Sequence, residues 1–200
     1  WSLVYQDYCG ILVLDPHDEY YGRNKLGLKD HPSNGKVIYY TPKAPPAGAK
    51  TLKINIQMIK PQHFDGVVDF SDPQKQALAL YYKYYGANWI KNILFERKIE
   101  GVSFIEQTIS VVKRRLLYLL DLEISGENII TKGIFDLNAG VNTIPDICKE
   151  LEDGKTVIID TSSFSGAVEI LIGSLITTEL FNNYKYYKMQ GTLNEKPTIS

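Results

Sequence analysis

Two short apolar runs, Ile11-Leu12-Val13-Leu14-Asp15 and Val157-Ile158-Ile159-Asp160, decide the fold class. Each run is apolar until it stops at an aspartate, a pattern typical of a strand buried on both faces of a parallel sheet. A helical stripe of apolar residues from Val168 to Leu180 follows the second run. Strands and helices that alternate with short connections favour right-handed βαβ units, so the sequence predicts an α/β protein with a mostly parallel sheet.

Further elements are expected on both sides of these runs. The segment 37–40 predicts a strand, and the alternation of apolar and polar residues over 51–58 predicts a half-exposed edge strand. Residues 2–9 have amphipathic spacing, which predicts a first helix that Gly10 ends. The chain begins without methionine and ends on Pro197-Thr198-Ile199-Ser200, which is typical of the start of a strand. We therefore expect both ends to be boundaries inside a longer protein.

The middle of the chain has a different pattern. Helices are expected from Pro73 to Gly86, over 88–94 and over 103–120, where apolar residues recur at helical spacing. We predict that residues 61–132 form an inserted helical bundle, and that residues 1–60 and 133–200 form the two parts of the α/β core.

Composition excludes several classes of protein. With 200 residues, 44% of them hydrophobic and 22% charged, the chain is typical of a globular protein. Lys and Arg total 22 against 23 Asp and Glu, so net charge gives no argument for nucleic-acid binding. Cys9 and Cys148 are too few for a disulfide framework and are expected to be small apolar residues. No signal peptide or run of about 20 apolar residues is present, so we expect a cytoplasmic protein without a membrane partner.

Ligands of parallel sheets bind at the carboxyl ends of the strands, where Asp15 and Asp160 are expected. Asp15 leads into Pro16-His17-Asp18-Glu19-Tyr20, which holds three acids and an imidazole with Asp15 included. These groups suit a divalent metal ion. They also suit the positioning of water or of nucleotide-bound Mg²⁺ in phosphoryl transfer. A solvated polar turn explains the same residues.

Other candidates have simpler explanations. His31 and His63 are expected to be surface histidines. The run Lys113-Arg114-Arg115 could contact phosphates or form a solvated helix face. The tyrosines of 81–85 and 184–187 are expected to pack in the core or at a subunit interface rather than stack on nucleic acid. The sequence contains no G-x-x-x-x-G-K-[ST], G-x-S-x-G or C-x-x-C motif.

The stretch Leu12-Val13-Leu14-Asp15-Pro16-His17-Asp18-Glu19-Tyr20 resembles the signature that follows the nucleotide-binding helix in HerA-type hexameric DNA translocases of the HerA–FtsK superfamily. Residues 157–162 with the helix after them, and Pro197-Thr198-Ile199, resemble the approach to that family's Walker B strand. The central helical block resembles the insertion that these proteins carry in a RecA-like core. The resemblance covers essentially the whole chain in element order and is specific in residues 15–20.

The resemblance implies an ATP-driven motor on double-stranded DNA, with ATP and Mg²⁺ as cofactors. Such proteins form hexameric rings and work with a NurA-type nuclease in DNA-end resection for repair. Asp15 and Glu19 would be the catalytic-site residues, and Asp160 a further site or structural residue. Asp18 stands where the family usually has glycine, so a looser turn is expected.

By the same resemblance, the Walker A lysine would precede Trp1, and the Walker B acids and arginine finger would follow Ser200. The 200 residues alone are therefore expected to be inactive, with no metal site of their own. Two alternatives remain open. One is a non-catalytic oligomerisation module with tyrosine-rich helices; the other is a metal-dependent phosphoesterase built on Asp15, His17, Asp18 and Glu19.

Overall fold

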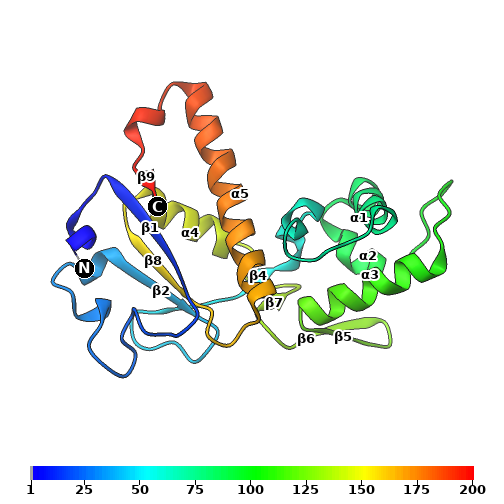
Figure 1. Ribbon diagram of the computed structural model, residues 1–200, viewed down its shortest axis with the longest axis horizontal. Coiled ribbons are helices and arrows are strands. Elements are labelled where there is room, and N and C mark those ends of the chain that lie inside the picture. The colour runs from blue at the N-terminus through cyan, green and yellow to red at the C-terminus, as the bar shows by residue number, and fades with distance from the viewer. Residues whose placement is uncertain (1) are drawn as a thin grey trace. The chain divides into compact units, whose positions relative to one another are not determined.

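The computed structural model describes residues 2–200, which form two compact units (Figure 1). The first unit combines the two ends of the chain, up to Leu52 and from Asn142 onward. The second unit holds Lys53–Val141. The limits of an inserted domain at 61 and 132 stay a prediction.

The first unit contains a five-stranded sheet in the order β3-β2-β8-β1-β9. Every neighbouring pair is parallel, which confirms the predicted α/β fold of the RecA-like type. The predicted apolar runs are its central strands, because β1 pairs with β8 from Ile11↔Thr156 to Asp15↔Asp160. The strands are β1 (Cys9–Asp15), β2 (Val37–Thr41), β3 (Lys50–Thr51), β8 (Thr156–Asp160) and β9 (Thr198–Ile199).

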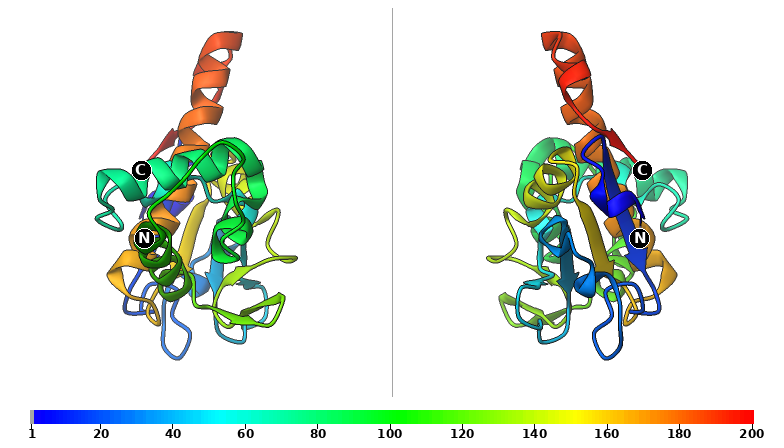
Figure 2. Two further views of the ribbon diagram at one scale, coloured as in Figure 1. Left: turned by 90° about the vertical axis from the view of Figure 1, so that its right-hand side faces the viewer. Right: turned by 90° about the vertical axis from the view of Figure 1, so that its left-hand side faces the viewer.

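Different layers cover the two faces of this sheet. Helices α4 (Thr143–Glu152) and α5 (Gly166–Gln190) pack against each other, and α4 packs on β1 and β8 (Figure 2). On the other face, Tyr39 and Ile158 belong to an apolar cluster with residues of the loop before β2 and of the 3-10 turn Ser2–Tyr5. Both faces of β8 are therefore buried, as its uninterrupted apolar sequence predicts.

The prediction of a helix over residues 2–9 that Gly10 ends is wrong. Only Ser2–Tyr5 is helical, and Gly10 lies inside β1, where it pairs with Ile199 of β9. A Cβ at Gly10 would come 2.2 Å from the carbonyl oxygen of Leu151. The glycine thus permits the end of α4 to contact the backbone of β1.

The second unit is mainly helical, as predicted for the middle of the chain. Its helices are α1 (Asp72–Tyr85), α2 (Trp89–Leu94) and α3 (Glu106–Leu119). The three helices pack against one another. Trp89, the first residue of α2, is fully buried, and its indole Nε1–H donates to the carbonyl oxygen of Ile59 at 2.8 Å. An antiparallel hairpin of β5 (Leu122–Ser125) and β6 (Asn128–Thr131) was not predicted.

The single edge strand predicted over 51–58 is also wrong. β3 ends at Thr51 in the first unit, whereas β4 (Ile54–Asn55) pairs with β7 (Phe135–Asp136) in the second. Leu52, Ile54 and Ile56 are all buried, because the chain passes here from one core into the other. None of the helices between residues 2 and 200 is long and apolar enough to span a bilayer.

The two histidines expected at the surface are buried. The Nδ1 of His63 accepts a hydrogen bond from the backbone N–H of Lys60 at 3.0 Å. The Nδ1 of His31 accepts from the N–H of Ser33 at 3.0 Å, and its ring lies 4.4 Å from that of Tyr5. Each imidazole satisfies a turn amide, which explains its place in the interior.

Candidate functional site

Asp15 and Asp160 are the last residues of neighbouring parallel strands and lie opposite each other. Thr41, the last residue of β2, lies at the same edge of the sheet, so three strands end together there. Parallel sheets bind ligands at this edge. The side chains of the three strand ends and of the loops after them therefore define the candidate site.

The Asp15 carboxylate is wholly buried and folds the turn that follows it. It accepts hydrogen bonds from the backbone N–H groups of His17 at 3.3 Å and Tyr20 at 2.9 Å. The carbonyl oxygen of Asp15 accepts from the N–H of Thr161 at 3.0 Å, which ties the ends of β1 and β8 together. Asp15 thus shapes the turn from within.

Asp18 lies in the left-handed backbone region, with φ of 52°. The Asp-for-Gly difference therefore does not loosen the turn in the way the resemblance suggests, because Asp18 itself adopts the conformation that glycine favours. Its carboxylate accepts a hydrogen bond from the Tyr39 hydroxyl. It also pairs with Lys43 Nζ at 3.1 Å and with Arg23 Nε at 3.3 Å.

Asp160 is fully buried and is the most heavily hydrogen-bonded carboxylate of the site. It accepts from Thr41 Oγ1 at 2.8 Å, from the N–H of Ser162 at 3.0 Å and from Ser162 Oγ at 2.6 Å. Lys43 Nζ lies 3.2 Å away. Burial alone would raise the pKa of Asp160, but these donors outweigh it and hold the pKa below its ordinary value.

Two cations and a tyrosine join these acids into one network. Arg23 donates to Thr41 Oγ1 at 2.9 Å and to the Tyr39 hydroxyl at 3.4 Å. Burial, together with the hydrogen bond to Asp18, raises the pKa of Tyr39 and keeps its hydroxyl protonated. Lys43, whose side chain is 42% exposed, bridges Asp18 and Asp160. We call these residues the polar edge: Asp15, Asp18, Arg23, Tyr39, Thr41, Lys43, Asp160 and Ser162.

Glu19 and His17 are exposed on the turn that Asp15 folds. Over residues 2–200, no group of three His, Cys, Asp or Glu side chains is placed to hold a metal ion. Asp15 and Asp18 are instead occupied by backbone amides and by cations. These contacts engage the two carboxylates on which the phosphoesterase alternative relies.

Sequence reasoning missed Arg23, Tyr39, Thr41, Lys43 and Ser162. Thr41, Lys43 and Ser162 could have been found, because each lies within three residues of the end of a predicted parallel strand. Nothing in the sequence indicates that Arg23 folds back from the long loop, or that the Tyr39 hydroxyl reaches this edge.

The other sequence candidates make contacts inside their own units. Lys113 pairs with Glu96 at 2.7 Å, and the guanidinium of Arg115 lies 5.5 Å from the ring centre of Phe70. The hydroxyls of Tyr81 and Tyr187 donate to the Arg97 carbonyl at 2.8 Å and to Glu152 at 2.6 Å, respectively. Tyr81 is buried, as predicted for the core, whereas Tyr84 and Tyr186 of the same clusters are exposed.

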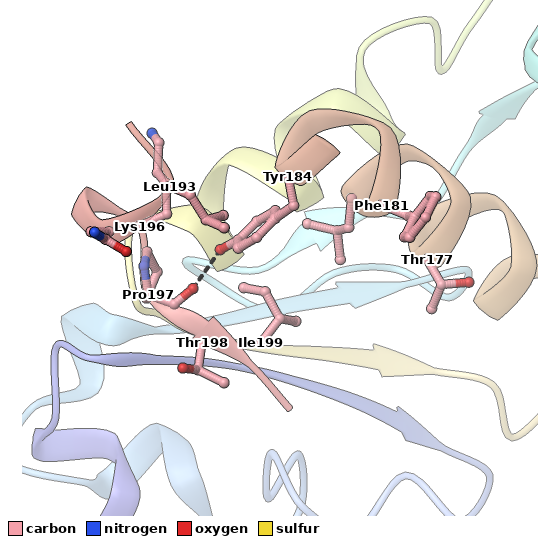
Figure 3. Close-up of a pocket in the computed structure, with 10 residues that line it drawn as sticks. Thr177, Phe181, Tyr184, Leu193, Lys196, Pro197, Thr198 and Ile199 are labelled. Carbon is pink, nitrogen blue, oxygen red and sulfur yellow. Dashed lines mark hydrogen bonds between the residues drawn. The ribbon is translucent and has the colours of Figure 1, made fainter. Parts of the chain in front are cut away.

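A hollow of about 700 Å³ lies beside β9 in the first unit (Figure 3). The Tyr184 hydroxyl closes one side by donating to the Pro197 carbonyl at 2.6 Å. The hollow offers an apolar surface rather than reactive groups. Its lining comes from α5, from the chain after it and from β9: Thr177, Leu180, Phe181, Tyr184, Leu193, Asn194, Lys196, Pro197, Thr198 and Ile199.

Comparison with protein families identifies a matching family. The model of a family described as helicase HerA, central domain, matches residues 1–180. A search of curated proteins found no match. The matched residues include the whole polar edge and all of the second unit.

Proposed function

The chain belongs to the HerA central-domain family, and on that premise we propose that it forms the core of an ATP-driven translocase of double-stranded DNA. Membership of this family identifies the chain as a module of the ATPase and helicase type. The finer assignment rests on the resemblance at residues 15–20 and on one observation of the structure. That observation is the turn after β1, which Asp15 folds so that Glu19 is exposed at the carboxyl edge of the sheet.

The proposal extends to the assembly and setting of the protein. We propose a hexameric ring that acts with a NurA-type nuclease in the resection of DNA ends for repair, in the cytoplasm. ATP and Mg²⁺ are the proposed cofactors. Both cysteines are free thiols, which is compatible with a reducing compartment.

The residues of the polar edge fit only part of an Mg²⁺–ATP site. The sequence has no phosphate-binding loop motif, and residues 2–200 place no three metal-ligating side chains together. Within this chain, we propose that Asp15 positions the turn and that the Glu19 carboxylate faces the ligand, where it can accept a hydrogen bond from water.

ATP hydrolysis by the full-length protein, with and without linear duplex DNA, tests the proposal. We expect hydrolysis that duplex DNA stimulates. Glu19→Gln removes the carboxylate charge with little change in shape, and we expect it to lower kcat about 100-fold while ATP binding persists. Glu195→Gln is the matched control, since Glu195 is also exposed in the first unit, and we expect it to behave as wild type.

The outcomes separate the function from the site. Absence of ATP turnover in the full-length protein would contradict the proposed function and favour the non-catalytic assembly module. Normal turnover in Glu19→Gln would contradict the role of Glu19 and leave the function standing.

A further inference from the structure

A second polar hollow, of about 500 Å³, lies within the second unit. One wall comes from α2 and the residues just before and after it, and the other from the turn between β5 and β6. Its volume is within the range of small-molecule sites and much larger than a phosphate ion. The lining residues are Asn88, Lys91, Asn92, Phe95, Arg97 and Glu127.

The backbone around this hollow is firmly held. α2 ends at Leu94, and Glu96, in the turn that follows, has a positive φ of 51°. The N–H of Arg97 donates back to the Asn92 carbonyl at 2.9 Å. The hydroxyls of Tyr81 and Tyr85 donate to the carbonyl oxygens of Arg97 and Lys98, each at 2.8 Å. The Arg97 backbone is therefore fixed through both its N–H and its carbonyl.

The cations of the hollow differ from those of the polar edge. Among the residues that the structure describes, the side chains of Lys91 and Arg97 make no hydrogen bond and no ion pair. Glu96, the acid next to Arg97, is paired with Lys113 at 2.7 Å. Glu127 is the one acid in the lining, so the hollow holds two cations against one carboxylate.

We propose that this hollow binds a nucleotide unit of a DNA strand. Lys91 and Arg97 supply charge for a phosphodiester group, and arginine is well suited to phosphate. The half-buried Phe95 ring offers a face on which an unpaired base of the strand can stack, and Asn88 and Asn92 add amide groups. The assignment rests on the proposed function, which it deepens by naming a DNA contact outside the polar edge.

Two substitutions that each replace a charged side chain by an uncharged one, at Arg97 and at Glu127, should change DNA affinity in opposite directions. Arg97→Met removes a phosphate contact, so we expect affinity to fall about tenfold and the slope of log affinity against log salt to fall by about one. Glu127→Gln removes the repulsive charge, so we expect affinity to rise about threefold. Lys83→Met is the control, because Lys83 is an exposed cation of the same unit that does not line the hollow.

The measurement is the fluorescence anisotropy of labelled oligothymidylate and of duplex DNA of equal length, titrated with the full-length protein at several salt concentrations. Equal effects of Arg97→Met and Lys83→Met, or unchanged affinity in Glu127→Gln, would overturn the site but not the DNA-binding function. Wild type that binds neither DNA would overturn both. If Arg97→Met abolishes binding of free thymidine monophosphate but leaves DNA binding unchanged, the ligand is a free nucleotide and the DNA assignment is wrong.

Discussion

Lys43 links the turn after β1, through Asp18, to the end of β8, through Asp160. The substitution Lys43→Met tests how much this link stabilises the polar edge. The substitution keeps most of the side-chain volume but removes the cation between Asp18 and Asp160. Hydrogen bonds to charged groups contribute about 1.5–3 kcal/mol each. Because the Lys43 side chain is 42% exposed and Thr41 and Ser162 still donate to Asp160, we discount the sum to about 2 kcal/mol.

Hydrogen exchange is the appropriate assay, since it reports stability locally in a chain of two units. A loss of about 2 kcal/mol corresponds to about 30-fold faster exchange of the amides at the ends of β1 and β8. Lys36→Met is the control, because Lys36 pairs with the exposed Asp7, and we expect it to change stability by less than about 0.5 kcal/mol. Lys43→Arg, which keeps the charge, should restore most of the protection.

The effect of Lys43→Met should also depend on pH with a definite sign. The pKa of Asp160 is lowered in the folded protein, so its stabilising contribution is present above the unfolded pKa of about 4. That contribution is lost as pH falls through the folded pKa, so wild type and Lys43→Met should converge in acid. Exchange in Lys43→Met that stays within about threefold of Lys36→Met at pH 7 would refute the reasoning.

Two further predictions concern stability. Gly10→Ala should destabilise the first unit by about 3 kcal/mol in a urea titration, because the new Cβ meets the Leu151 carbonyl. Gly35→Ala is the control and should be nearly neutral, because no atom lies within 4 Å of its new Cβ. Equal unfolding midpoints for the two variants would contradict the close approach of α4 to β1. Burial lowers the pKa of His63 from 6.5 to about 4, so the unfolded state binds more protons between these values, and wild type should lose about 3 kcal/mol as pH falls through this window. His63→Asn should remove most of this dependence in unfolding titrations across pH 4–7, and parallel curves for the two proteins would show that His63 is not its source.

The parts of the fold that the sequence predicts are those with strong local signals. The central strands have uninterrupted apolar runs, and α1 starts at a proline-containing first turn and is capped by Gly86 at its end. Gly10 has no such signal, because its place in β1 depends on pairing with β9 at the opposite end of the chain. The alternation over 51–58 misleads because the chain changes cores within it.

In the candidate site, too, some residues can be predicted from local sequence and others cannot. The apolar pattern predicts where the strands end, and Asp15 and Asp160 lie at that edge of the sheet. Their partners could not be assigned, since Arg23 and Lys43 come from loops whose course is set by tertiary contacts. The histidines show the same limit: each is buried because its ring accepts from a turn amide, which no local pattern indicates.

The short pairing of β4 with β7 bears on the order in which the protein folds. β8 must join β1 and β2 across the intervening residues 53–141, and closing a flexible loop of that length would cost about 4 kcal/mol of chain entropy. β4 and β7 bring the two ends of that segment together, and Gly140 lies directly against the Lys53 backbone. Once the second unit has folded, β8 is therefore tethered to β2 by a short connection. Folding of the second unit before the sheet would therefore lower the chain-entropy cost of adding β8.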